Sequence, residues 1–285
     1  MENKPEFTMP EPAEIFGSYT AWNYDPETWI ISFMNGSQYM YLLEGSQKAL
    51  LIDTGYGTGT LRRFAETLTD KKLEVVNTHF HPDHSGGNGE FEEVYVACGW
   101  ETDAPSVNDG DYPFDLNSLP YPNYYKKIVK DGEKIDLGER SVEIIGALPA
   151  HCNSSLFLLD ESHGMLFTGD EYETAQTIMI DNSHNPAAPY HVRTRIENLK
   201  ANAVRLKEFD EKYDFLFPNH NGAPASKSYL DDYIELCDSI LEHRCKIENK
   251  LNHKYLEMDP RADHMCRVRY GKVSIIILKE ELARI

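Results

Sequence analysis

The sequence predicts a mixed α/β or α+β fold in one domain that spans residues 1–285. Two observations carry this prediction. Short apolar runs of the kind that form strands alternate with helical patterns in both halves of the chain, and no convincing linker separates the halves. Apolar residues make up 41% of the 285 residues, which is enough for a sizeable core.

The first half of the chain predicts short strands and one helix. The strand-like runs are apolar and are bounded by turn residues such as glycine, asparagine and aspartate. The last of them but one leads directly into a turn rich in histidine. The expected strands cover residues 28–34, 39–43, 49–52, 75–77 and 93–97, and the expected helix covers residues 60–68.

The pattern breaks down over residues 102–131, which are rich in proline, aspartate, asparagine and tyrosine. We expect an aromatic-rich loop insertion here. Long irregular segments of this kind often form a lid or the wall of a pocket, and we favour a pocket wall. The alternative is a segment that only covers exposed core.

The second half of the chain repeats the alternation of strands and helices. A polar loop that ends at Pro189 separates its strands from its helices. Apolar positions spaced by a turn or two indicate the helices. The expected strands cover residues 142–145, 155–159 and 165–168, the expected helices cover 192–209 and 227–249, and a final buried strand covers 266–278.

Residues 79–84 read HFHPDH and place four potential metal ligands in one turn after an apolar run. Such a turn can direct His79 and His81 toward one ion while Asp83 and His84 reach a second. Imidazole and carboxylate together suit zinc, manganese or iron. The alternative is a chance cluster among eleven histidines.

Three later residues, His151, Asp170 and His220, each stand where an apolar strand-like run ends. Taken singly, an aspartate after Thr-Gly is often a turn former, and a lone histidine is more often a hydrogen-bonded structural residue. Taken as an ordered set with residues 79–84, they predict a site for two metal ions.

This order of ligands resembles that of the metallo-β-lactamase-fold hydrolases, and the resemblance covers nearly the whole chain. Asp53-Thr54-Gly55 is also similar to the early D-T-G turn of that family. The resemblance implies a four-layer αββα sandwich. It also implies a role for each ligand: His79, His81 and His151 for one metal, Asp83, His84 and His220 for the other, Asp170 as the bridge, and Asp53 as a carboxylate that orients a ligand, or else as an ordinary turn residue.

The resemblance further implies a dinuclear hydrolase in which a metal-bridging hydroxide attacks a small ester-like substrate: a thioester, ester, lactone or phosphodiester. Zinc is the expected metal, with iron or manganese as alternatives, and Asp83 or Asp170 would take the proton. The β-lactam-cleaving branches usually carry Cys or Ser at the position of Asp170, which makes β-lactam hydrolysis a weaker alternative. A mononuclear iron persulfide dioxygenase and a non-catalytic binding module on the same scaffold are also compatible with the pattern.

Six further residues near the ligand turns are candidates for substrate contact, although each could equally be a surface or packing residue. Quorum-signal lactonases of the family place a tyrosine three residues after the bridging aspartate, whereas here the tyrosine lies two residues after it. Arginines 193 and 195 begin an expected helix, so solvated charge is the default expectation for both. The candidates are Tyr56, Tyr172, His184, Tyr190, His191 and Arg193.

Composition and charge limit the classes of partner and the cellular compartment that we expect for this protein. A net charge of −19 repels polyanions, so we expect a small-molecule substrate and no nucleic acid. No signal-peptide pattern is apparent, and no apolar run approaches the roughly 18 residues of a membrane-spanning helix. Five widely spread cysteines predict a reducing, cytoplasmic setting. A homo-oligomer is compatible with all of these features.

Overall fold

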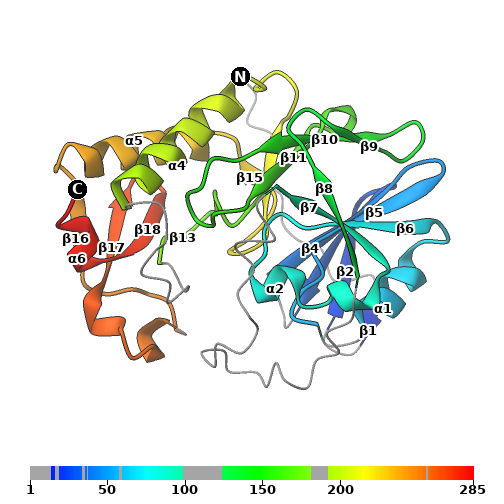
Figure 1. The fold of residues 1–285 in the computed structure, drawn as a ribbon, viewed down its shortest axis with the longest axis horizontal. Helices are drawn as coiled ribbons and strands as arrows, with labels where there is room; N and C mark the ends of the chain where they lie inside the picture. The colour runs from blue at the N-terminus through cyan, green and yellow to red at the C-terminus, as the bar shows by residue number, and fades with distance from the viewer. Residues whose placement is uncertain are drawn as a thin grey trace.

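Two large β-sheets face each other in the computed structural model, with helices on their outer faces and a smaller third sheet at one end (Figure 1). The structure describes residues 14–16, 19–33, 36, 38–57, 60–98, 124–180, 192–254 and 256–285. This arrangement is the αββα sandwich that the sequence motif implies.

The first sheet has eight strands that lie side by side in chain order. Neighbours are antiparallel from β1 to β5 and parallel from β5 to β8, so β5 and β6 end at the same edge. The strands are β1 (Glu14–Phe16), β2 (Tyr19–Asp25), β3 (Thr28–Phe33), β4 (Gln38–Glu44), β5 (Lys48–Ile52), β6 (Lys72–Val76), β7 (Glu93–Ala97) and β8 (Tyr125–Val129).

The second sheet has six strands in the order β15-β14-β12-β11-β10-β9. Strands β12 and β14 are parallel, and β10 runs in the same direction as both because β11 is antiparallel to β10 and to β12. These three strands therefore end at one edge. The bounds are β9 (Lys134–Asp136), β10 (Ser141–Gly146), β11 (Leu156–Asp160), β12 (Met165–Gly169), β14 (Phe215–Pro218) and β15 (Ala225–Ser226).

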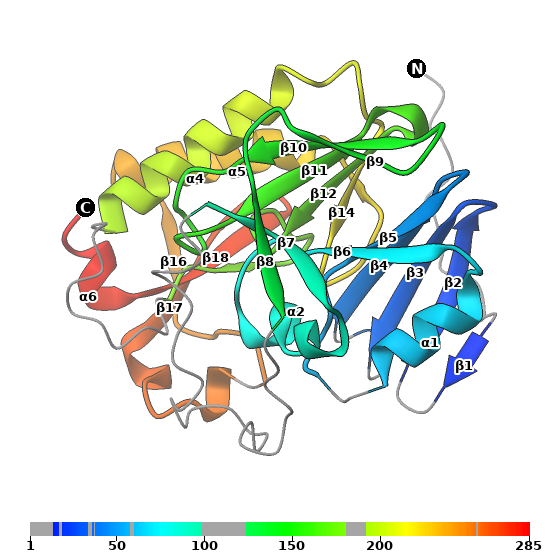
Figure 2. The same ribbon diagram turned by 45° about the vertical axis from the view of Figure 1, so that its right-hand side comes forward.

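Helices cover the outer faces of the two large sheets (Figure 2). Helix α1 (Leu61–Leu68) buries Leu61, Phe64 and Leu68, spaced by three and four residues, against the first sheet. Helices α4 (Val192–Lys207) and α5 (Tyr229–Leu241) pack against each other and cover the second sheet. The short helices are α2 (Pro82–Ser85), η1 (Asn88–Glu90), η3 (Glu161–His163), η4 (Leu256–Met258), η5 (Ala262–His264) and α6 (Lys279–Leu282).

The third sheet packs on α5 and has the strand order β13-β18-β17-β16. The single strand expected over 266–278 is a hairpin, because the chain turns at Gly271, whose φ of +51° lies in the left-handed region that favours glycine. The strands are β13 (Thr177–Ile178), β16 (Lys246–Glu248), β17 (Met265–Tyr270) and β18 (Val273–Leu278).

Two more expectations need correction. The helix expected over 227–249 ends at Leu241, since His243 adopts a φ of +57° that no α-helix continues through, and β16 follows. The loop insertion expected over 102–131 ends earlier, because residues 125–129 form β8, which pairs with β7. Residues 102–123 lie outside the described part of the chain.

Candidate metal centre

Seven side chains with metal-binding atoms converge at one edge of the two large sheets. Strand β6 leads to the turn at residues 79–84, β10 leads to His151, β12 to Asp170 and β14 to His220. Strands that run in the same direction end at the same edge, so residues far apart in the sequence meet there. These seven are the residues that the sequence motif singles out.

His79, His81 and His151 form the first group. The Nδ1 atom of His81 lies 3.0 Å from His79 Nε2 and 3.0 Å from His151 Nε2. The three rings are steeply inclined, with interplanar angles of 73° to 84°. Three ring nitrogens that converge from different directions form an arrangement typical of zinc sites with histidine ligands.

Asp83, His84, Asp170 and His220 form the second group. The Oδ2 atom of Asp83 lies 3.5 Å from His84 Nε2 and 3.2 Å from His220 Nε2, and the two imidazole nitrogens are 3.4 Å apart. Each residue of the group offers one ligand atom, and all of these atoms lie within 4.8 Å of one another. The second group thus combines two nitrogen and two oxygen donors.

The carboxylate of Asp170 lies between the two groups. Its Oδ2 atom is 3.9 Å from His79 Nε2 and 3.7 Å from His151 Nε2 on one side. On the other side it is 3.3 Å from His84 Nε2 and 3.5 Å from His220 Nε2. A single oxygen atom is therefore within reach of ligands of both groups.

Gly169 sets the path of the chain into Asp170. Its φ of +57° is left-handed, and a Cβ atom at this position would lie 3.0 Å from the side chain of Thr78. Asp170 is buried, and its Oδ1 atom has no hydrogen-bond partner among the residues that the structure describes. A buried carboxylate oxygen without a partner is costly unless a cation or a water satisfies it.

Asp53 contacts His84 at Nδ1, the ring nitrogen that does not face the second group. Its Oδ2 atom accepts hydrogen bonds from His84 Nδ1 (2.8 Å), Thr78 Oγ1 (2.7 Å) and Asn219 Nδ2 (2.8 Å), and Oδ1 accepts one from Thr78 N (2.8 Å). Asp53 is wholly buried and has a left-handed φ of 63°. Its carboxylate leaves His84 Nε2 directed at the second group, which is how outer carboxylates orient histidine ligands.

His151 is also oriented from behind, but by the main chain. Its Nδ1 donates to the carbonyl of Ile178 at 2.6 Å, which leaves Nε2 for the first group. Arg195, for which solvated charge is the default expectation from the sequence, is instead buried, and it donates to the carbonyl of His151. The packing of α4 against the loop explains the difference.

Burial dominates the electrostatics of the first group. Loss of hydration, helped by the neighbouring His151 ring, lowers the pKa of His81 to about 3. Burial also lowers the pKa of His79 and that of His151. The three imidazoles are therefore neutral near pH 7, which is the form that binds a cation.

In the second group, opposite charges outweigh burial. Burial alone would lower the pKa of His220, but the charge of Asp170 and a hydrogen bond with Asp83 raise it to about 10. Burial alone would likewise raise the pKa of both carboxyls, yet the nearby His84 holds each well below its usual range. A buried anion, Asp170, and a half-buried one, Asp83, require positive charge beside them, and a divalent cation would supply it. The donor set and the charge thus fit zinc, iron or manganese.

The structure places the six substrate-contact candidates differently. Tyr56 is half-buried. Tyr172 is wholly buried and its hydroxyl donates to the Leu199 carbonyl at 2.6 Å, so it packs in the core in place of the expected substrate contact. Arg193 is exposed on α4 and pairs with Glu197 at 3.0 Å. The remaining three candidates, His184, Tyr190 and His191, lie outside the described residues.

His253, which follows β16, is a neighbour of the second group that no sequence pattern singles out. Burial, together with repulsion from His220, lowers its pKa. No motif surrounds His253, so no signal in the sequence indicates that it interacts electrostatically with His220.

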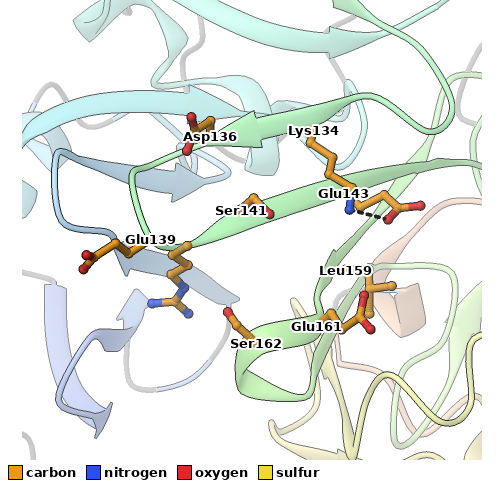
Figure 3. Close-up of a pocket in the computed structure, with 9 residues that line it drawn as sticks. Lys134, Asp136, Glu139, Ser141, Glu143, Leu159, Glu161 and Ser162 are labelled. Atoms are coloured by element: carbon orange, nitrogen blue, oxygen red, sulfur yellow. Dashed lines mark ion pairs between the residues drawn. The ribbon is translucent and has the colours of Figure 1, made fainter.

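A separate hollow lies along β9, β10 and η3, and Figure 3 shows its charged lining. Lys134 and Glu143 form an ion pair in it at 3.4 Å. None of the seven converging residues lines this hollow, so it is not part of the candidate metal centre.

Residues 34–220 match the sequence model of the metallo-beta-lactamase superfamily, and this range includes all seven converging residues. The chain belongs to this superfamily. This chain is a hydrolase of the superfamily, and its His/Asp cluster can bind metal. The confirmed features are thus the fold, the superfamily and the hydrolase class.

Relatives and structures agree with this family. The chain is 27% identical over 208 residues to the acyl-coenzyme A thioesterase MBLAC2 of Gallus gallus. The matched region covers 64% of this chain and 71% of the relative. For the protein of the same name from Homo sapiens, the identity is 26% over 214 residues, with 64% and 72% covered.

Solved structures of the same fold include the sec-alkylsulfatase Pisa1 from Pseudomonas sp. (TM-score 0.60, 20% identity, covering 78% of this chain and 42% of that chain). A metallo-beta-lactamase from Pontibacter korlensis has a TM-score of 0.56 at 17% identity, and the match covers 77% of this chain and 99% of that chain. None of the helices in the described part of this chain has the length and hydrophobicity that a transmembrane helix requires.

Proposed function

We propose that the chain is a dinuclear metal-dependent hydrolase that cleaves a small thioester of the acyl-coenzyme A class. The observation that carries the dinuclear part is the position of Asp170, whose Oδ2 lies within 3.9 Å of ligand nitrogens in both groups. The relatives named as acyl-coenzyme A thioesterases support the thioester part. Zinc is the metal that we expect.

In this proposal the first group would hold one cation, the second group would hold the other, and Asp170 would be a ligand that both cations share. When bound, the two cations would lower the pKa of a water molecule and polarise the carbonyl oxygen of the substrate. The oxygen of the attacking water would form the new C–O bond as the C–S bond breaks. One of its protons would go to a carboxylate of the site and the other to the leaving sulfur, so the products are a carboxylate and a thiol. The Oδ1 atom of Asp170, or the Asp83 carboxylate, is available to take the proton from the attacking water.

The function is tested on the full chain by elemental analysis and by hydrolysis assays. We expect about two metal ions per chain, zinc foremost, and cleavage of acyl-coenzyme A in preference to a β-lactam, a lactone and a phosphodiester. The Asp170→Ala variant should lose activity by at least about 100-fold while it keeps its fold, because it loses the shared ligand.

Three results would contradict the proposal in different ways. A metal-replete chain that is inactive on every substrate indicates a binding module. One iron per chain with oxygen uptake on a persulfide indicates a dioxygenase. A preference for another ester-like substrate would leave the dinuclear site standing and would overturn only the thioester assignment.

A further inference from the structure

His151 lies in a run of bends over residues 149–154, five residues after the end of β10, whereas His79 follows β6 by three residues and His81 directly precedes α2. Two ionisable side chains, Arg195 and Glu171, hold its main chain. Arg195 on α4 donates from Nε to the carbonyl of Ala150 (2.6 Å) and from Nη2 to the carbonyl of His151 (3.0 Å). Glu171 accepts a hydrogen bond from His151 N at its Oε2 atom (3.3 Å).

Both side chains are buried, which is unusual for arginine and glutamate. Arg195 is 6% exposed and Glu171 is 2% exposed. Burial of a guanidinium is costly unless its donors are satisfied, and here two of them are directed at successive carbonyls of one loop. The planar fork of arginine holds two neighbouring acceptors in one fixed geometry, whereas the ammonium of a lysine is a point charge on a flexible stem.

We propose that Arg195 and Glu171 form a clamp that fixes the main chain at His151 and thereby sets the cation affinity of the first group. This inference rests on the proposed metal site. Arg195 and Glu171 are positioning residues, since they act through His151. The clamp joins three parts of the chain: the His151 loop, the residue that follows Asp170, and helix α4.

Arg195 variants test the first half of the clamp. Arg195→Ala removes both carbonyl contacts and should weaken the binding of one of two Zn²⁺ ions by roughly 10- to 100-fold, the usual effect of losing a contact behind a ligand. Arg195→Lys should be intermediate. The matched control is Arg205→Ala on the same helix, because Arg205 also donates to a carbonyl, that of Gly146 at 2.7 Å, but not in the His151 loop. Its Zn²⁺ affinities should equal those of the unmodified chain.

Glu171 variants test the second half. Glu171→Gln keeps an oxygen that can accept from His151 N, so its Zn²⁺ affinity should stay close to that of the unmodified chain. Glu171→Ala leaves the buried N–H of His151 without its acceptor. It should lower the affinity for the same Zn²⁺ ion whose binding Arg195→Ala weakens. The two dissociation constants are measured by competition with a coloured chelator. The free energy of unfolding of each metal-free variant is measured in parallel.

The paired measurements separate the clamp from a merely structural role. If Arg195→Ala and Glu171→Ala both bind two Zn²⁺ ions as tightly as the unmodified chain and lower only the free energy of unfolding, the proposal is overturned. If Arg195→Ala does not fold, Arg195→Lys and the Glu171 pair decide in the same way. If the unmodified chain binds no Zn²⁺, the failure belongs to the proposed function and not to the clamp.

Discussion

Asp53 joins three separate parts of the chain through one carboxylate. It accepts hydrogen bonds from Thr78 before the metal-binding turn, from His84 within that turn and from Asn219 next to His220. Its left-handed backbone is strained for a residue with a side chain, and these contacts hold it in place. The carboxylate thus belongs to the construction of the second group.

Asp53→Ala should lower the affinity for one of the two Zn²⁺ ions by roughly 10- to 100-fold, because His84 Nδ1 loses the acceptor that orients its ring. We expect this ion to be the one that Arg195→Ala does not affect, since Asp53 lies behind the second group and Arg195 behind the first. Chelator competition measures both constants. Asp70→Ala, an exposed position, is the control. An Asp53→Ala variant with both affinities intact would show that the carboxylate only shapes the turn.

At the scale of elements, the two large sheets are tied together by Arg140, which precedes β10. Its guanidinium contacts Asp160 of the second sheet (2.8 Å from Nε to Oδ2) and donates to the carbonyl of Glu27 (2.6 Å) and to Thr28 Oγ1 (2.9 Å) at the start of β3 in the first. Arg140 is 3% exposed and Asp160 is wholly buried. This buried contact therefore links the two large sheets where β10 and β3 begin.

Arg140→Ala should lower the free energy of unfolding by about 3 kcal/mol, because among the described residues it leaves the buried Asp160 carboxylate with Ser162 and His163 alone as side-chain partners. Urea unfolding measures the change. The control is Lys134→Ala, which breaks an exposed ion pair on β9 and should cost less than about 1 kcal/mol. Equal midpoints for the two variants would mean that Arg140 does not stabilise the sandwich.

At the scale of the whole molecule, the net charge of −19 bears on the proposed substrate. Acyl-coenzyme A carries phosphates and is itself anionic, so the protein as a whole repels it at long range. The Debye length falls from about 30 Å at 0.01 M salt to about 10 Å at 0.1 M, which screens most of this repulsion.

The value of kcat/KM for acyl-coenzyme A should therefore rise, by up to about tenfold, between about 0.01 M and about 0.1 M salt. A neutral thioester of the same acyl group, made with N-acetylcysteamine, is the control and should show little change. Initial rates at low substrate concentration give both values. A decrease with salt for acyl-coenzyme A alone would mean that a local cationic patch, and not the net charge, governs its approach.

Much of the metal centre could be predicted from short patterns. Residues 79–84 form a local motif, and His151, Asp170 and His220 follow apolar runs that can be recognised singly. Several strands could not be predicted. Strand β8 has a mostly exposed pattern, and β13 and β15 have two residues each, so none of them carries a clear strand signal. The single-domain organisation over 1–285 stays a prediction.

The sequence by itself determined the kinds of ligand, their order and the family, because these depend on residue chemistry within short segments. Only the tertiary structure decided which residues contact and position the ligands from outside the two groups. The burial of Arg195 depends on how α4 packs against the His151 loop, and that of Tyr172 depends on its contact with the same helix. Such contacts join segments without a shared motif, and packing alone brings them together.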